Sequence, residues 1–137
     1  MDEMKIQMTP VEKCKKLDTI QKYDKLNNVY AVDEAGPGGA HHKYALVFSG
    51  DDDGALINSK GMIQFQCGPR KDPNSKHGWL DTDLLEIVRD RLKDFQNGPF
   101  ATGDNAKALE HIEIALMYMN KRVEERAARG VLGTNTK

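Results

Sequence analysis

Two apolar stripes of helical period flank the turn Asn97-Gly98-Pro99. Such spacing places apolar side chains on one face of a helix, and a Gly-Pro pair ends a helix. The first segment, residues 84–96, follows Thr82 or Asp83 as its cap, and the second follows Thr102 or Asp104 and runs to about residue 129. The stripes consist of Leu85, Val88, Leu92 and Phe95, and of Leu109, Ile112, Leu116, Met119 and Val123. The pattern predicts an antiparallel helical hairpin.

The second predicted helix carries more apolar residues than one hairpin can cover. Ile114, Met117 and Tyr118 flank its stripe. Surplus apolar surface of this kind marks a contact with another chain, and contacts between identical chains are the most common kind. We therefore expect a homo-oligomer.

The first half of the chain reads as a small antiparallel sheet. Residues 28–33 (NVYAVD), 43–49 (KYALVFS) and 62–67 (MIQFQC) alternate well enough to be strands. The run Gly36-Pro37-Gly38-Gly39 forms a loop between the first two. Residues 50–61 read as a polar loop that closes a hairpin between the last two.

The N-terminal segment has the form of a helix start. Thr9-Pro10-Val11-Glu12 resembles a capping box with proline at the first helical position. Val11, Cys14, Leu17 and Ile20 would follow along one stripe. A short N-terminal helix is predicted here.

These segments together predict an α+β fold. We expect a β-rich region with a short helix over residues 1–78, and a helical hairpin with a Gly/Thr tail over residues 79–137. A chain of 137 residues suits one compact unit with a modest core.

Charge and cysteine content narrow the partners and the compartment. A net charge of −1 gives no general attraction to duplex nucleic acid or to a membrane surface. Residues 121–137 contain five basic and two acidic residues, so a small anion could bind locally. The two thiols, Cys14 and Cys67, suit a reducing cytoplasm, and we expect neither a targeting peptide nor a membrane-spanning segment.

Candidate catalytic and metal-binding groups do not form a recognised pattern. His41-His42 and Asp51–Asp53 match no zinc spacing, and the acidic loop lacks the glutamate of a calcium site. His111 stands near acidic residues without a local nucleophile. The sequence predicts no metal, no cofactor and no enzymatic activity.

Arginines at the end of the second predicted helix have two possible roles. Arg122, Arg126 and Arg129 stand at i, i+4 and i+7, close to one face. Guanidinium groups bind phosphates with paired hydrogen bonds. Arginines in a last helical turn also satisfy free carbonyl groups and oppose the helix dipole. Residue types alone favour the second role.

Three residues suggest a nucleotide site near the hairpin bend. Phe95 can stack on a base, although it can equally close the apolar stripe. Asn105 stands in the first turn of the second helix, where anions are favoured. Arg70, at a strand end, could supply countercharge. Together they would provide stacking, polar recognition and neutralisation of phosphate.

Several motifs between residues 43 and 134 resemble a family of phage anti-defence proteins. The likeness is to the Thoeris anti-defence protein one family, whose helical hairpin is shared with anti-CBASS protein two. The motifs are Gly68-Pro69-Arg70, Phe95-Gln96-x-Gly98-Pro99-Phe100, Asp104-Asn105-Ala106-x-Ala108-Leu109 and Arg126-x-x-Arg129-Gly130-x-x-Gly133-Thr134. Thr102-Gly103 departs from the more polar or charged pair expected in this family.

The resemblance implies a sponge for immune signalling nucleotides in the cytoplasm of an infected bacterium. Arg70, Phe95 and Asn105 would hold a cyclic ADP-ribose isomer of Thoeris immunity. Arg122, Arg126, Gly133 and Thr134 would hold cyclic di- or trinucleotides of CBASS immunity. A dimer, or a homohexamer built from dimers, is implied. The alternatives are a structural or regulatory phage protein whose hairpin only mediates oligomerisation, and an enzyme that degrades the signal.

Overall fold

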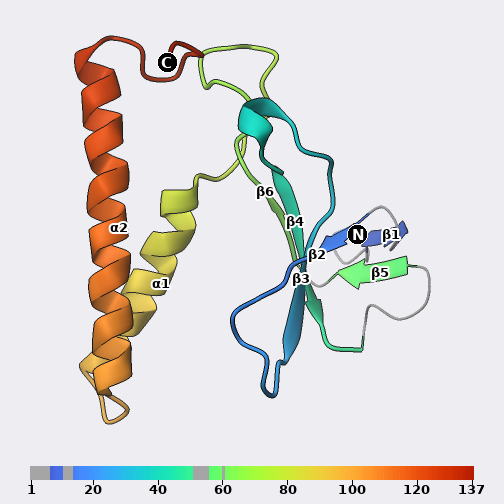
Figure 1. Cartoon of the computed structure of the whole chain (residues 1–137), viewed down its shortest axis with the longest axis vertical. Coiled ribbons are helices and arrows are strands. Elements are labelled where there is room, and N and C mark those ends of the chain that lie inside the picture. The colour runs from blue at the N-terminus through green and yellow to red at the C-terminus, as the bar shows by residue number, and fades with distance from the viewer. Residues whose placement is uncertain (1–6, 11–13, 51–55, 60) are drawn as a thin grey trace, which may run out of the picture. The chain divides into compact units, whose positions relative to one another are not determined.

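The computed structural model describes residues 7–10, 14–50, 56–59 and 61–137, which fall into two compact units (Figure 1). The sheet unit comprises Met1–Gly68 and Lys76–Gly78, and the helical unit comprises Pro69–Ser75 and Trp79–Lys137. An antiparallel sheet precedes two long helices along the chain. The predicted α+β class is confirmed.

The main sheet has four antiparallel strands in the order β2-β3-β4-β6. Their bounds are β2 Lys15–Lys16, β3 Asn27–Ala31, β4 Lys43–Phe48 and β6 Gly61–Gln64. The three strands predicted from alternation correspond to β3, β4 and β6. The register places Ala45 of β4 opposite Tyr30 of β3 and Met62 of β6.

One face of this sheet carries the core of the sheet unit. Tyr30, Ala45 and Val47 are buried, and Cys14, Val32 and Met62 pack against them. Alternate residues of β4 point to this face because side chains alternate along a strand. Burial raises the pKa of the Cys14 thiol, so this cysteine is a packing residue more than a reactive one.

A second, two-stranded sheet pairs β1 (Gln7–Pro10) with β5 (Leu56–Ser59). The predicted N-terminal helix is therefore wrong at Thr9 and Pro10, and Ile20 of its proposed stripe is 100% exposed. The segment 50–61, predicted to be a loop, also contains strand β5. Antiparallel pairing of segments so distant in sequence leaves no local periodic signal, and it overrides the capping pattern. Residues 11–13, 51–55 and 60 lie outside the described residues, and with them Asp51–Asp53.

The glycine-rich loop between β3 and β4 is held by Asp33. Its carboxylate Oδ2 accepts from the backbone N–H of His42 at 2.9 Å, and Nδ1 of His41 donates to the Asp33 carbonyl at 2.7 Å. The loop contains a short 3-10 turn, Pro37–Gly39, in which Gly38 has a φ of 73°. Only glycine adopts this backbone conformation without strain.

The helical hairpin consists of α1 (Asp81–Gln96) and α2 (Gly103–Ala128). Helix α1 begins three residues earlier than predicted, with Leu80 as its N-cap and the Asp83 carboxylate accepting from the Leu80 N–H at 2.8 Å. Helix α2 begins as predicted, because the Thr102 hydroxyl accepts from the N–H of Asn105 at 3.0 Å. A side-chain oxygen that accepts from the third helical N–H satisfies one of the free donors of the first turn.

The two helices bury little of their own surface. Arg89 of α1 donates to Glu113 of α2 at 2.8 Å, and this hydrogen bond raises the pKa of the guanidinium. Among the described helical residues, none in α1 is buried, and in α2 only Arg126 is. No helix in the described part of the chain is both long and apolar enough to cross a bilayer.

Large apolar side chains therefore remain exposed along both helices. Met117 and Tyr118 are each 68% exposed. The others on the hairpin are Ile87, Val88, Phe95, Phe100, Ile114 and Val123. Ile114, Met117 and Tyr118 are the surplus apolar residues that the sequence predicted. Val88, Phe95 and Val123 were predicted to lie in the stripes between the helices, and they remain more than 40% exposed.

The Asp33 carboxylate should make the stability of the sheet unit depend on pH. Burial alone would raise its pKa, but backbone N–H groups, including that of His42, and the charge of His41 lower it below 3.8. A carboxylate with a lowered pKa stabilises the fold above its unfolded-state pKa, and this contribution is lost as pH falls through the folded value. Asp33→Asn should cost about 1 kcal/mol at pH 7, and this difference should disappear as the pH falls through the lowered pKa of folded Asp33.

The measurement is urea unfolding followed through β4 amide resonances at several pH values. The control is Glu34→Gln, which alters an exposed neighbour. A cost of Asp33→Asn that stays constant down to pH 2 would contradict the prediction.

Candidate functional site

Helix α2 ends in a turn that only glycine completes easily. Arg129 is the C-cap, and Gly130 follows with a φ of 73°. The N–H of Val131 donates to the carbonyl of Arg126, and that of Gly130 to Ala127, both at 3.0 Å. This pair of bonds is a Schellman motif, which satisfies carbonyls that the helix leaves free. It directs residues 130–137, here called the tail, away from the helix axis.

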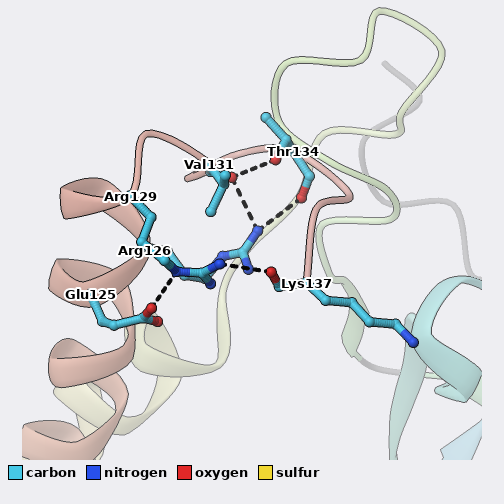
Figure 2. Close-up of polar contacts among 6 residues, drawn as sticks. All are labelled: Glu125, Arg126, Arg129, Val131, Thr134 and Lys137. Atoms are coloured by element: carbon cyan, nitrogen blue, oxygen red, sulfur yellow. Dashed lines mark hydrogen bonds and ion pairs between the residues drawn. The ribbon is translucent and has the colours of Figure 1, made fainter.

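The guanidinium of Arg126 holds the tail in place (Figure 2). Its Nη2 donates to the carbonyl of Val131 at 3.0 Å and to that of Thr134 at 3.1 Å. The Thr134 hydroxyl donates to the same Val131 carbonyl at 2.5 Å. Arg126 is only 8% exposed, so these carbonyls replace the water that its charge has lost.

The other two arginines of the predicted row differ in environment. Arg129 pairs with Glu125 through Nε and donates from Nη1 to the backbone oxygen of Lys137 at 2.8 Å (Figure 2). Arg122 is exposed. In this structure, Arg126 and Arg129 thus bind backbone oxygens of the tail, beyond the end of α2.

A pocket of about 430 Å³ lies between the tail and the segment that follows β6. Both segments belong to the helical unit. The backbone N–H of Lys71 donates to the carbonyl of Gly133 at 3.0 Å and joins the two walls. We call this the tail pocket, and it is lined by Arg70, Lys71, Ala127, Gly130, Leu132 and Gly133.

The hairpin bend is the second place where predicted residues meet. Phe95 is 43% exposed, and the Arg91 guanidinium carbon lies 5.6 Å from its ring centroid. The Gln96 side chain clamps the bend by accepting from the Thr102 N–H and donating to its carbonyl, each at 3.1 Å. Asn105 stands in the first turn of α2, half-buried.

The structure separates Arg70 from Phe95 and Asn105 within one chain. Arg70 lies beside Gly133 in the tail pocket, whereas Phe95 and Asn105 are at the opposite end of α2. The helix rises 1.5 Å per residue, so Asn105 and Arg126 lie about 30 Å apart along it. The residues expected to hold a cyclic ADP-ribose isomer are therefore not gathered by a single copy. Their assignment to that ligand stays a prediction.

Metal-binding groups form no cluster in the described part of the chain. Across residues 7–10, 14–50, 56–59 and 61–137, no three His, Cys, Asp or Glu side chains are placed to share an ion. His111 is exposed on α2.

The helical part matches a known family model. Residues 58–124 match the model described as Acb2/Tad1, hairpin domain, a stretch that contains β6, α1 and most of α2. This part of the chain is similar to the Acb2/Tad1 hairpin domain. The family resemblance predicted from the sequence is confirmed.

One relative, a phage protein, is similar to about half of this chain. The chain is 43% identical over 75 residues to Thoeris anti-defense 1 of Bacillus phage SBSphiJ7, a stretch covering 55% of this chain and 52% of the relative. The matched stretch thus spans about half the length of the relative.

Two features of the Acb2/Tad1 hairpin unit were missed by reasoning from sequence. Lys71 follows Arg70 directly, but only Arg70 was selected, because the contact of Lys71 with Gly133 joins residues 62 positions apart. The adjacent cations after Gly68-Pro69 were the available signal. The Gln96 clamp was also missed, since a glutamine at a helix end has no distinctive pattern.

Removing the Arg126 guanidinium should loosen the tail. Arg126→Met keeps much of the aliphatic bulk but leaves the Val131 and Thr134 carbonyls without their donor. We expect a loss of about 1–3 kcal/mol and faster amide exchange at Val131 and Thr134. The control, Arg122→Met, alters an exposed arginine one turn earlier and should change neither. Unchanged exchange at both amides in Arg126→Met would refute the anchoring role.

Proposed function

We propose that this protein is a phage anti-defence sponge that sequesters small signalling nucleotides in the infected bacterium. The observation that carries the proposal is the Acb2/Tad1 hairpin match together with the likeness to a Thoeris anti-defence protein. The finer proposal is that it binds a cyclic ADP-ribose isomer, and cyclic di- or trinucleotides at a second site. No metal, cofactor, duplex nucleic acid or membrane takes part.

The hairpin bend supports recognition of a nucleobase. A half-exposed ring with a guanidinium over it offers stacking and positive charge at one point. Asn105 lies in the first turn of α2, where free N–H groups and the helix dipole favour an anion. Clamping of the bend by Gln96 holds the ends of both helices in place before any ligand arrives.

Two copies are needed to complete this first pocket. Arg70 lies at the far end of α2 from the bend, so it can join Phe95 and Asn105 only from another chain. An antiparallel pairing of hairpins would bring the tail end of one copy to the bend of the next. The exposed apolar surface that includes Met117 and Tyr118 supports such pairing, because burying it is favourable. We propose a closed homo-oligomer built from such dimers.

The tail end supports the second pocket. Arg122 is exposed on the last turns of α2, and Arg126 fixes the position of Thr134. A cyclic oligonucleotide carries phosphates around a ring, whereas one helix presents its cations from one side. Equivalent arginines from neighbouring copies would surround the ring in a closed oligomer.

Phe95→Ala tests the first pocket. The change removes a stacking contact worth roughly 1–3 kcal/mol per base, so binding of the cyclic ADP-ribose isomer should weaken about 5- to 150-fold. Folding should survive because the ring is 43% exposed. Calorimetry with the isomer and with a cyclic trinucleotide measures both sites, and the trinucleotide affinity should not change. Unaltered affinity for the isomer in a folded Phe95→Ala protein would refute the pocket.

A mixing experiment tests whether that pocket spans two copies. Arg70→Ala and Phe95→Ala each lack one half of every pocket. Refolding the two variants together forms mixed oligomers in which some pockets regain both residues. We expect the mixture to bind the isomer more tightly than either variant does alone. If the mixture binds no better than its components, the pocket lies within one chain.

Sequestration also predicts that the ligand is released intact. After prolonged incubation, heat denaturation of the complex should return the cyclic ADP-ribose isomer with unchanged mass by mass spectrometry. A buffer incubation without protein is the control. Recovery of a linear or hydrolysed product, growing with protein concentration and time, would make the protein an enzyme. A folded oligomer that binds no cyclic nucleotide would support the structural alternative.

A further inference from the structure

We infer that the tail pocket is a preformed anion site in which Lys71 and Arg70 bind a phosphate group of the captured nucleotide. The identity of the nucleotide rests on the proposed function. The pocket itself rests on the contacts between Lys71, Arg70 and the tail. It adds Lys71 to the residues that hold the ligand.

The charge of the tail pocket sets it apart within the helical unit. Its lining contains two cations and no carboxylate. A pocket of similar volume beside Arg89 is lined by Glu86 and Glu113, and another at the bend by Glu110 and Glu113. Carboxylates repel phosphate, whereas the guanidinium fork and the lysine ammonium both attract it. We therefore expect an anionic ligand to bind more favourably in the tail pocket than in the other two pockets.

Three contacts fix the shape of this pocket before a ligand enters. The Lys71 N–H holds the Gly133 carbonyl at 3.0 Å. The Arg126 guanidinium holds Val131 and Thr134 from behind. The Schellman turn at Gly130 fixes the exit from α2. A pocket whose walls are already ordered loses less conformational entropy when a ligand binds.

Gly133 lets the lysine stem lie against the tail. Its φ is 79°, and a Cβ built there would lie 3.3 Å from Cγ of Lys71 and 3.6 Å from Cβ of Arg70. Both the backbone conformation and the close approach of Lys71 favour glycine. The aliphatic part of Lys71 is thus packed while its ammonium can reach a ligand.

The cations at the tail end of the hairpin therefore have different roles in ligand binding. Lys71 and Arg70 touch the ligand. Arg126 is a positioning residue, because its Nη2 donates hydrogen bonds to two tail carbonyls and its side chain is buried. An Arg126 variant would thus weaken binding by loosening Gly133 and Thr134, whereas a Lys71 variant would weaken it without loosening the tail.

The first experiment titrates the full protein with inorganic pyrophosphate and follows its amide resonances. Amides of Lys71, Gly130 and Gly133 should shift together, and Lys71→Gln should weaken pyrophosphate binding about tenfold. Lys71→Arg keeps the charge and should bind within about threefold of the original protein. Lys15→Gln, an equal change of charge on exposed strand β2, is the control and should have no effect. Shifts confined to other residues, or equal binding by Lys71→Gln, would overturn the inference.

A second titration separates this inference from the proposed function. The cyclic ADP-ribose isomer, whose pocket is proposed to include Arg70, should bind Lys71→Gln about tenfold more weakly than the original protein, with tail amide exchange unchanged. If the original protein binds pyrophosphate at these amides but no cyclic nucleotide, the pocket stands and the sponge function fails. If the protein binds the cyclic ADP-ribose isomer equally well with and without the Lys71 side chain, and the tail amide resonances do not shift, the sponge function stands and the pocket fails.

Discussion

Burial of the Arg126 guanidinium organises the C-terminal end of the helical hairpin. A charge that loses water must regain hydrogen bonds from the protein, and here the carbonyls of Val131 and Thr134 provide them. The tail must therefore turn back across the end of α2 and not continue along it. Gly130 makes that turn possible, and the contact of Gly133 with Lys71 follows from it. The tail pocket therefore depends on the hydrogen bonds that the buried Arg126 guanidinium donates to tail carbonyls.

A second constraint acts along the length of the hairpin. Two helices alone bury no side chain of α1, and large residues such as Tyr118 stay exposed. Helices in proteins owe most of their stability to tertiary packing of an apolar face. Association of copies would supply that packing, and it would also bring opposite ends of neighbouring hairpins together. Stability and ligand capture would then depend on the same contacts.

Capture without turnover fits the chemistry of the described residues. Stacking on Phe95 and charge pairing with Arg70, Lys71 and Arg122 would be binding interactions, each worth only a few kcal/mol. Several must act together to hold a small ligand tightly. The proposed closed oligomer, which would repeat each pocket, would supply such a set of interactions from a short chain.

The sequence by itself determined the parts of this protein that depend on local pattern. Alternation located β3, β4 and β6, the 3.6-residue period located α1 and α2, and Thr102 marked the start of α2, because each signal lies within a few neighbouring residues. The sequence also contained the family motifs and both candidate ends of the hairpin. Tertiary structure alone decided the pairing of β1 with β5, which replaced a predicted helix, and the meeting of Lys71 with Gly133. It also decided that Arg126 faces carbonyls of its own chain and that Arg70 lies far from Phe95. These outcomes join residues distant along the chain, and such contacts depend on how the whole chain packs.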